Sequence, residues 1–348
     1  MFTLPPTMRA WTHINPGAPS TVLTLAPTLP VPTLLTPTSL LIAISHASLN
    51  PGGSILMALY PAVFRKKPCI PELDFSGTVV RVGEGVPAER GLKEGVEVFG
   101  SIPVGQHVGK GVGALAEFVA VEHTSVFPKP ATIGFEEAAG LGVAGATALC
   151  LVDAAGLKVG DRVLVNGASG GCGHLAVQLA KNAVGESGKV VAVCSGRNAD
   201  FVKGLGADEV IDYTAHPSLP IHLSTLLIDA RGSQPLFTHS RSYLHPDGPF
   251  VSVGIAPTSY AYLPMLSALG KMLGNNMRPR VLGGVGRKHV QVAAVSTLET
   301  LERLGGLVGE GRVKVVVGDV FGMGDVLKAY DLMLSKHARG KIVVKVAN

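Results

Sequence analysis

The sequence has few cysteines, few aromatic residues and little excess charge, and these shortages exclude several classes of protein. Its 348 residues include 4 cysteines, none of them in a C-x-x-C pair. We therefore expect reduced thiols in a cytoplasmic protein rather than a disulfide framework. Aromatic residues make up 5% of the chain and the net charge is +5, with no basic block or basic aromatic stripe. This pattern predicts no nucleic-acid partner.

The sequence also lacks an unbroken apolar run long enough to span a bilayer. The apolar stretch at 21–49 is interrupted by Pro27, Pro30, Pro32 and Pro37. The amino terminus has no charged region followed by an apolar core and a cleavage site, so we expect no membrane partner. Hydrophobic residues make up 47% of the chain, enough at this length for two packed domains.

What the sequence does contain is a glycine-rich stretch between two short apolar strands. The run Val-Leu-Val at 163–165 leads into Asn-Gly-Ala-Ser-Gly-Gly-Cys-Gly at 166–173, and an amphipathic helical pattern follows. A second strand pattern at 189–194 gives the spacing of a βαβ unit. Backbone N–H groups at such a helix start bind phosphate, and the pattern predicts dinucleotide binding, with a structural turn as the alternative. The candidate cofactor residues here are Ser169, Gly170, Gly171, Cys172 and Gly173.

The residues after the second strand favour NADPH over NADH. An NAD site usually has an acid there, whereas this chain has Ser-Gly-Arg-Asn at 195–198 and no acid before Asp200. Ser195 can donate to a 2′-phosphate and Arg197 can meet it with a charged guanidinium. The cofactor candidates of this loop are Ser195, Arg197 and Asn198. In the alternative interpretation, Ser195 or Asn198 caps a helix and Arg197 is a solvated surface charge.

Strand and helix patterns divide the chain into three segments. Residues 1–129 are β-rich with Gly and Pro turns and predict a small barrel-like domain. Residues 130–287 alternate apolar strands with helices, which predicts a doubly wound parallel sheet of α/β class. Residues 288–348, with a helix expected over 290–304, look like the first segment, so the middle domain is expected to be inserted into a discontinuous one. Ligands bind at the carboxyl ends of parallel strands, which adds Gly254 to the cofactor candidates.

Short motifs along nearly the whole chain stand in the order of one known family. They are Ser-Leu-Asn-Pro at 48–51, Asp-Phe-Ser-Gly at 74–77, Gly-Ala-Leu-Ala-Glu-Phe at 113–118, Gly-Ala-Thr-Ala at 145–148, Gly-Ala-Asp-Glu-Val-Ile-Asp-Tyr at 206–213 and Gly-Lys-Ile-Val at 340–343. On these motifs the sequence resembles the medium-chain dehydrogenase/reductase superfamily, in its zinc-free branch of quinone oxidoreductases and enoyl reductases. The resemblance implies a GroES-like β-barrel catalytic domain, an inserted Rossmann domain and a hydride-transfer cleft between them.

The resemblance also predicts that no metal is bound. Zinc-dependent relatives need a Cys, a His within Gly-His-Glu and a further Cys or Asp, because zinc takes three protein ligands and one open position. The matching positions of this chain hold Asn50, Leu73 and Leu141, and two leucines cannot ligate zinc.

Reduction of a carbon–carbon double bond conjugated to a carbonyl needs less help from a Lewis acid than reduction of a plain ketone. The resemblance therefore implies an NADPH-dependent, metal-independent reductase of an enone or an enoyl thioester. The alternatives are an NADPH:quinone reductase and a non-catalytic NADPH-binding protein. An apolar or aromatic conjugated carbonyl is the expected substrate, and a carrier-bound form in secondary metabolism is compatible. Zinc-free relatives are often homodimers through an edge strand, here near Val281.

Two residues are catalytic candidates by this resemblance. Asn50 matches the Asn-Pro position of the family, and its amide could donate to a carbonyl oxygen; a turn cap is the alternative. Tyr60 lies near the tyrosine that enoyl reductases use as proton donor, but one residue too close to Asn50, and half-buried packing is the alternative. Related chains commonly carry Asp where this chain has Gly53.

Three more residues match positions near the cofactor in the family. Thr147 resembles the residue beside the nicotinamide or its phosphate, Tyr213 the tyrosine beside the adenosine phosphate, and Lys341 a lysine near the cofactor. The alternatives are a threonine that bonds to its own helical turn, strand-end packing, and a solvated lysine at the start of a strand.

Overall fold

The computed structural model describes residues 3–215, 224–256, 259, 261–277, 284–293 and 295–347. Contacts divide the chain into two units. The first unit comprises Met1–Ala146, Val295–Gly311 and Val315–Asn348, and the second comprises Thr147–Ala294 and Arg312–Lys314. The first division falls later than position 129, because the helix α4 (Phe135–Ala139) packs on strands of the first unit.

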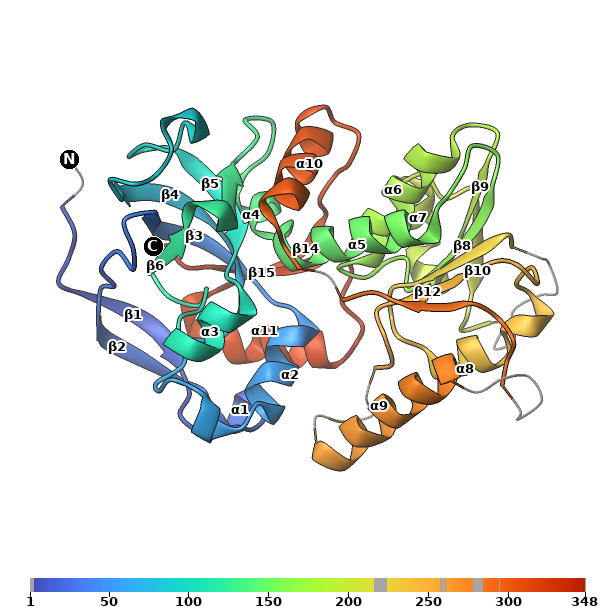
Figure 1. Ribbon diagram of the computed structural model, residues 1–348, viewed down its shortest axis with the longest axis horizontal. Helices are drawn as coiled ribbons and strands as arrows, with labels where there is room; N and C mark the ends of the chain where they lie inside the picture. Colours follow the sequence, from blue (N-terminus) through green and yellow to red (C-terminus); the bar gives the residue numbers. More distant parts are fainter. Residues whose placement is uncertain are drawn as a thin grey trace. The chain divides into compact units, whose positions relative to one another are not determined.

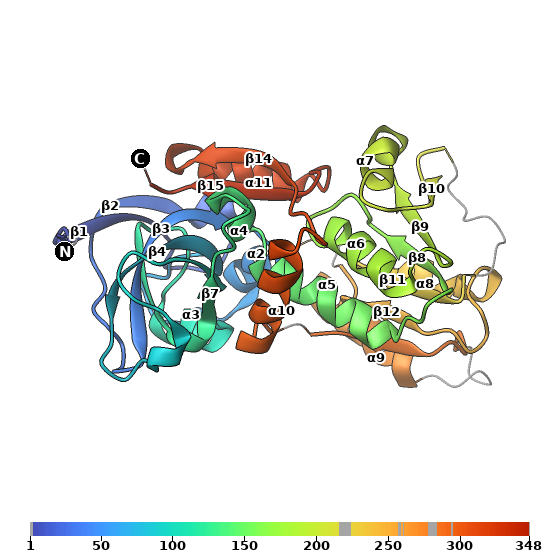
Figure 2. The same cartoon turned by 90° about the horizontal axis from the view of Figure 1, so that it is seen from above.

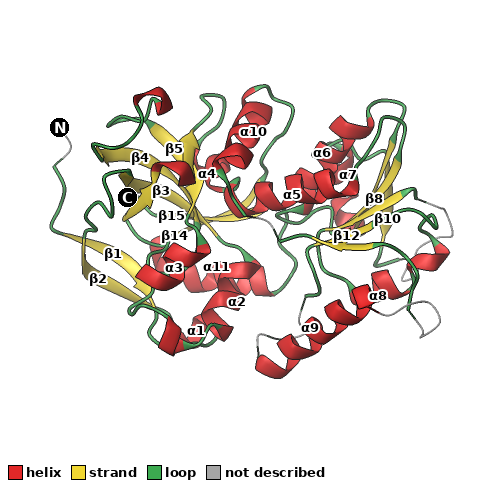
Figure 3. Ribbon diagram, in the orientation of Figure 1, coloured by secondary structure: helices red, strands yellow, loops and turns green. Residues whose placement is uncertain are grey.

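The first unit is built on β-strands, with several helices packed around them (Figure 3). Its strands are β1 (Thr7–Thr12), β2 (Thr24–Pro30), β3 (Ser39–Ser48), β4 (Asp74–Val82), β5 (Glu97–Ser101), β6 (Phe118–Glu122), β7 (Val126–Pro128), β14 (Val317–Gly322) and β15 (Lys341–Lys345). Its other helices are α1 (Pro19–Val22), α2 (Pro51–Leu59), α3 (Val104–Lys110), α10 (Leu298–Gly309) and α11 (Val326–Leu334), and α5 (Gly142–Ala155) crosses into the second unit.

The strands of the first unit bring the two ends of the chain together. The main sheet has the order β14-β15-β3-β4-β5-β7, β6 also pairs with β3, and β1 and β2 form a separate pair. β15 pairs antiparallel with β3 and parallel with β14 (Figure 2). Buried side chains such as Phe75, Leu115 and Tyr330 fill the core of this unit, because burial of large apolar surface is the main favourable term in folding. Residues near the chain end therefore lie beside residues 40–50.

The second unit is a parallel sheet covered by helices on both faces. Its strands are β8 (Arg162–Asn166), β9 (Lys189–Cys194), β10 (Glu209–Asp212), β11 (Leu226–Asp229), β12 (Phe250–Ser252) and β13 (His289–Gln291). Its helices are α6 (Gly173–Val184), α7 (Ala199–Lys203), α8 (Gln234–Thr238) and α9 (Tyr262–Met277). Figure 1 shows α6 and α7 on one side of this sheet and α8 and α9 on the other.

The strand order of this sheet is that of a Rossmann fold. The order is β10-β9-β8-β11-β12-β13, and every pairing is parallel. The chain leaves β8 towards one edge, through β9 and β10, and then returns to β11 on the other side of β8. The order therefore reverses between β8 and β11, and ligands of such sheets bind beside this switch point.

The helix predicted over 290–304 is wrong in its first half. His289–Gln291 forms β13, which pairs with β12 at the end of the sheet. The helix α10 begins only at Leu298, after Thr297, whose side chain accepts a hydrogen bond from the Thr300 N–H. Val290 therefore lies in a strand, because pairing with β12 overrides the short helical pattern around it.

The sequence predicted a homodimer contact and no membrane partner. Val281, near which a dimer contact was predicted, lies outside the described residues. Among the residues that the structure describes, no helix is both long and apolar enough to cross a membrane.

Packing of α6 against β8 depends on the lack of a side chain at Gly173, which gives a stability prediction. A Cβ atom at Gly173 would lie 2.0 Å from the Gly167 carbonyl oxygen, whereas one at Gly170 would lie 3.4 Å from it. We expect Gly173→Ala to lower the free energy of unfolding by about 1–3 kcal/mol, because backbone atoms must shift. Gly170→Ala is the matched control and should leave the melting temperature almost unchanged. Calorimetry of both variants tests this, and equal melting temperatures would contradict it.

Candidate active site and cofactor site

The glycine-rich turn connects β8 to α6 in the second unit. Gly167 has a φ of 73°, a left-handed conformation that glycine adopts without steric cost. A Cβ atom built on Gly170 would have only the Gly167 carbonyl oxygen within 4 Å, at a distance of 3.4 Å. A diphosphate can therefore approach the backbone here and meet the first N–H groups of α6, which spans 12 residues. Ser169, Gly170, Gly171, Cys172 and Gly173 all belong to this turn.

The loop after β9 is tied directly to the glycine-rich turn. The Asn198 side-chain amide donates to Ser169 Oγ at 3.1 Å and to Ser195 Oγ at 3.2 Å. Ser195 and Asn198 stand at the N-cap positions of the 3₁₀ turn Gly196–Asn198 and of α7, as the alternative interpretation expected, but neither side chain makes a cap hydrogen bond there. Arg197 is exposed next to these residues. The loop thus presents a hydroxyl group and a cation beside the turn.

A buried carboxylate shapes the neighbouring loop at the switch point. Asp229, at the end of β11, accepts a 2.8 Å hydrogen bond from the Asn166 amide at the end of β8. It also accepts from the backbone N–H groups of Arg231, Gly232 and Ser233. These bonds hold the loop that follows β11 against the end of β8.

Arg231 is a cofactor candidate that the sequence interpretation missed. A Cβ atom on Gly167 would lie 3.1 Å from Arg231 Cβ, so Arg231 stands beside the glycine-rich turn. Its guanidinium carbon lies 5.7 Å from the centre of the Tyr213 ring, within cation–π distance. The signal in the sequence was a lone arginine two residues after an apolar strand that ends in Asp229. Only the strand order shows that this position is next to the glycine-rich turn.

The other cofactor candidates are dispersed. Tyr213 directly follows β10 and is 39% exposed, and Gly254 follows β12 with a φ of 103°. Both lie at the carboxyl end of the sheet. Thr147 is half-buried in α5. Lys341 belongs to the first unit, where its ammonium group donates to Asn50.

Asn50 lies in a buried polar cluster of the first unit, directly before α2. Lys341 Nζ donates to Asn50 Oδ1 at 2.8 Å and to the Leu49 carbonyl at 3.1 Å. Asn50 Nδ2 donates to Asp74 Oδ2 at 2.9 Å and, over a longer 3.4 Å, to the Ser48 carbonyl. A donor on one side and an acceptor on the other fix the orientation of the amide. Lys341 is 2% exposed, so it is not a solvated lysine.

Two carboxyl groups complete this cluster. Asp74 accepts from the Val143 N–H, 2.9 Å from each of its oxygens, and burial raises its pKa while Lys341 opposes that shift. Glu72 accepts from the Tyr330 hydroxyl at 2.7 Å and from the Asn50 N–H at 3.0 Å. Burial raises the pKa of Glu72 to about 8, against the effect of these two hydrogen bonds. This raised pKa favours the protonated form of Glu72 at neutral pH.

Tyr60 lies at the other end of α2. Asn50 precedes the helix and Tyr60 follows it, so the two stand about 15 Å apart along its axis, and no described hydrogen bond joins them. The Arg65 guanidinium carbon lies 5.7 Å from the centre of the half-buried Tyr60 ring. The structure thus does not bring the two catalytic candidates together.

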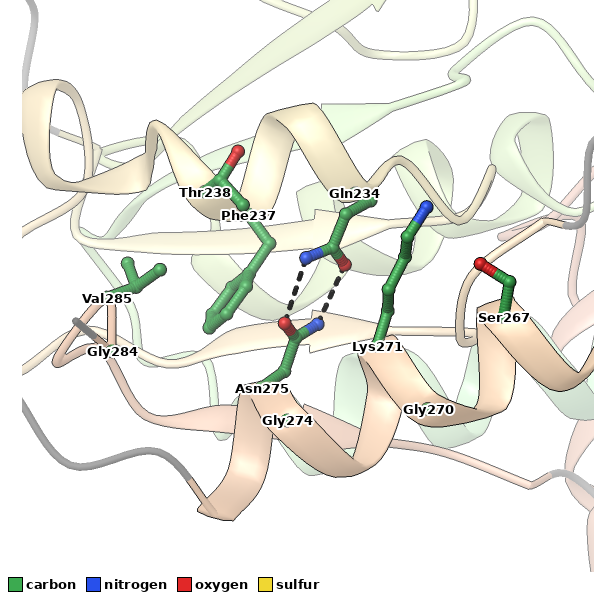
Figure 4. A pocket seen from close by; sticks show the side chains of 10 residues that line it. All are labelled: Gln234, Phe237, Thr238, Ser267, Gly270, Lys271, Gly274, Asn275, Gly284 and Val285. Carbon is green, nitrogen blue, oxygen red and sulfur yellow. Dashed lines mark hydrogen bonds between the residues drawn. The ribbon is translucent and has the colours of Figure 1, made fainter. Parts of the chain in front are cut away.

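A separate hollow of about 330 Å³ lies between α8 and α9 in the second unit (Figure 4). Gln234 and Asn275 face each other across it and exchange two hydrogen bonds of 2.9 Å. Its lining includes none of the predicted site residues. The hollow therefore adds no group to the candidate sites.

Two of the three positions that the resemblance aligns with zinc ligands are apolar and buried. Leu73 is 8% exposed and Leu141 is 0% exposed. Within the described residues, no three His, Cys, Asp or Glu side chains gather closely enough to hold a metal ion.

A parallel Rossmann sheet with this turn in the second unit, combined with the β-rich first unit, defines a class: two-domain oxidoreductases that use a nicotinamide dinucleotide. Comparison with known proteins agrees. The family described as "Alcohol dehydrogenase GroES-like domain" matches residues 36–131, and that described as "Zinc-binding dehydrogenase" matches residues 205–344. The second match does not include positions 50, 73 and 141.

Full-length relatives define the family more narrowly. The trans-enoyl reductase poxH of Penicillium oxalicum is 34% identical over 98% of this chain and 98% of its own. The trans-enoyl reductase pgmF of Aspergillus terreus is 32% identical over 99% and 98%. The solved quinone oxidoreductase from Coxiella burnetii has a TM-score of 0.77 at 29% identity and covers 98% of this chain and 99% of its own. This chain belongs to the medium-chain dehydrogenase/reductase superfamily, in the branch of these reductases.

The raised pKa of Glu72 predicts a pH dependence of stability. The folded protein keeps a proton up to about pH 8 that the unfolded chain releases near pH 4.5. The stabilisation is therefore complete below pH 4.5 and declines as the pH rises to 8. We expect the wild type to lose up to about 1.4 kcal/mol per pH unit relative to Glu72→Gln across this window.

Trp11 provides the measurement. It is the only tryptophan of the chain and is buried in the first unit, where its indole N–H donates to the Met323 carbonyl. Urea unfolding followed by its fluorescence gives the stability of the unit that holds Glu72. A constant difference between wild type and Glu72→Gln from pH 4.5 to 8 would contradict the assignment.

Proposed function

We propose that the chain is an NADPH-dependent, metal-independent reductase of activated carbon–carbon double bonds, acting on an enone or an enoyl thioester in secondary metabolism. The full-length similarity to trans-enoyl reductases of two fungi carries this proposal. Leucines at two of the three positions of zinc ligands support a reaction without a metal. The substrate is a small apolar or aromatic conjugated carbonyl compound, free or bound to a carrier.

The chain supplies binding, orientation and a proton path. Bound reduced nicotinamide supplies the hydride for the β-carbon of the conjugated system. We assign stabilisation of the enolate oxygen to the Asn50 amide, which Lys341 and Asp74 hold in one orientation. Its 3.4 Å hydrogen bond to the Ser48 carbonyl is the weaker one, and a charged substrate oxygen is a stronger acceptor. Tyr60 is the candidate proton donor to the α-carbon, with water as its competitor.

A quinone reductase is the second candidate function. Its specific support is the similarity to the quinone oxidoreductase from Coxiella burnetii and to a chloroplast envelope quinone oxidoreductase homolog of Arabidopsis thaliana, which is 35% identical over 82% of each chain. The same groups would serve, but the single proton that accompanies the hydride would go to a quinone oxygen instead of the α-carbon.

A homodimer is part of the proposal. β13 ends the described sheet, and the free backbone groups of an edge strand can pair with a second copy. A molar mass measurement in solution tests this.

The function is tested by cofactor consumption with enones, enoyl thioesters and quinones. With deuterated NADPH, we expect deuterium at the β-carbon of a reduced enone or thioester. We expect Asn50→Ala to lower kcat about 10²-fold, as loss of an oxyanion donor does. Tyr60→Phe removes only a hydroxyl group and should lower kcat about tenfold or more if Tyr60 donates the proton.

Three outcomes decide between the candidates. Turnover of quinones alone favours the quinone reductase. Tight NADPH binding without turnover of any compound favours a binding protein. Wild-type kcat in both variants would show that the catalytic assignment is wrong.

Two arginines should affect the cofactors differently. Arg197 would face the 2′-phosphate, which only NADPH carries, so Arg197→Ala should weaken NADPH binding about 10–100-fold and NADH binding hardly at all. Arg231 beside the glycine-rich turn would face the diphosphate, so Arg231→Ala should weaken both equally. Lys203→Ala, which removes an exposed charge at the end of α7, is the matched control. Titration by nucleotide fluorescence measures these affinities, and equal effects of Arg197→Ala on both cofactors would contradict the choice of NADPH.

A further inference from the structure

The first turn of α2 contains a hollow at Gly53, and a carboxyl group from another segment fills it. A Cβ atom on Gly53 would lie 2.4 Å from Glu72 Oε1 and 2.7 Å from both Cδ and Oε2. Gly53 has no left-handed φ, so the backbone does not require glycine there. Glycine inside a helix is unfavourable relative to alanine. The space taken by the Glu72 carboxyl group therefore accounts for Gly53.

The backbone of Glu72 is unusual for a glutamate. Its φ is 65°, in the left-handed region that side chains with a Cβ atom rarely adopt. A strained backbone conformation is retained when contacts with the surrounding residues stabilise it, and Glu72 has such contacts. Glu72 is 1% exposed and bonded to the Asn50 N–H and the Tyr330 hydroxyl. The backbone carbonyl of Glu72 is fixed as well, because the Ala114 N–H donates to it at 2.9 Å.

The charges around Glu72 decide its protonation. The groups that face it are Asp74 from β4, Lys341 from β15 and Tyr330 from α11. Two carboxylates against one ammonium group would leave a net negative charge in a buried site, which is unfavourable. One proton makes the cluster neutral. Asp74 has the Val143 N–H and the Asn50 amide as donors and Lys341 nearby, so Glu72 is the group that keeps the proton.

We propose that Glu72 is a positioning residue of the reductase site: its carboxyl group, seated in the space at Gly53, fixes the backbone of Asn50 and the start of α2. The proposal rests on the proposed function, because Asn50 is the enolate-stabilising residue there. Neutral Glu72 holds this turn without adding charge beside the Asn50 amide. Ionised Glu72 would place a negative charge next to the developing enolate, so the positioning works in the protonated form.

The experiment moves the carboxyl group from position 72 to position 53. Glu72→Gly removes the carboxyl group and relieves the left-handed backbone, so the protein should fold but lose about tenfold or more in kcat with little change in KM. Gly53→Asp alone should be strongly destabilised, because its side chain has no space beside Glu72. The double variant Gly53→Asp/Glu72→Gly returns a carboxyl group to the same hollow from the helix and should recover most of the kcat lost in Glu72→Gly.

Glu72→Gln distinguishes positioning from simple packing. Glutamine resembles the protonated acid, and its amide can bond to both Asn50 N–H and the Tyr330 hydroxyl, so it should recover kcat relative to Glu72→Gly. The kcat of the wild type should fall above about pH 8, whereas that of Glu72→Gln should not follow this titration.

Wild-type kcat in Glu72→Gly, or a double variant no better than Glu72→Gly, would overturn the proposal. Its failure can be told from failure of the proposed function. If the wild type reduces no compound tested, Trp11 fluorescence still measures whether Gly53→Asp is less destabilising in the Glu72→Gly background. If the changes in the free energy of unfolding caused by the two substitutions are additive, the Glu72 carboxyl group does not occupy the space beside Gly53. This result needs no substrate.

Discussion

Burial of two carboxyl groups and one ammonium group beside a single asparagine is the constraint on which the first unit depends. Asn50 lies between Lys341 and Asp74, and Glu72 holds its backbone. Removal of any one member leaves a buried charge or polar group without its partner, which costs more than the original bond contributes. The cluster therefore requires β15 and α11, from the end of the chain, to pack beside residues 49–74.

The second unit has its own organising contact, at the point where the strand order reverses. The Asn166–Asp229 hydrogen bond joins the ends of β8 and β11, and Asp229 then shapes the loop that carries Arg231. The glycine-rich turn, the loop after β9 and this loop consequently meet at one end of the sheet. A Rossmann sheet offers backbone amides to a diphosphate at this place, and the side chains add hydroxyl groups and cations.

The first unit has a hydrogen-bond network at positions that the family resemblance aligns with zinc ligands. Leu73 stands where a zinc-binding histidine would be, and it is flanked in sequence by Glu72 and Asp74. Both flanking carboxyl groups belong to the buried cluster around Asn50. The neighbours of Leu73 thus form a hydrogen-bond network that orients the Asn50 amide. In the proposed reaction this oriented amide is the donor to the enolate oxygen.

The local sequence determined the parts of this protein that depend on neighbouring residues. The glycine-rich turn, the apolar strands of the parallel sheet and the family motifs each lie within a short stretch, so the Rossmann and GroES-like classes and Ser169–Gly173 as part of the turn could be predicted. The tertiary structure alone decided the rest. Lys341 and Asn50 are 291 positions apart, and Asn166 and Asp229 are 63 apart. The fit of Glu72 into the hollow at Gly53 and the place of Arg231 beside Gly167 depend on the path of the chain, because contacts between distant segments leave no periodic pattern in the sequence.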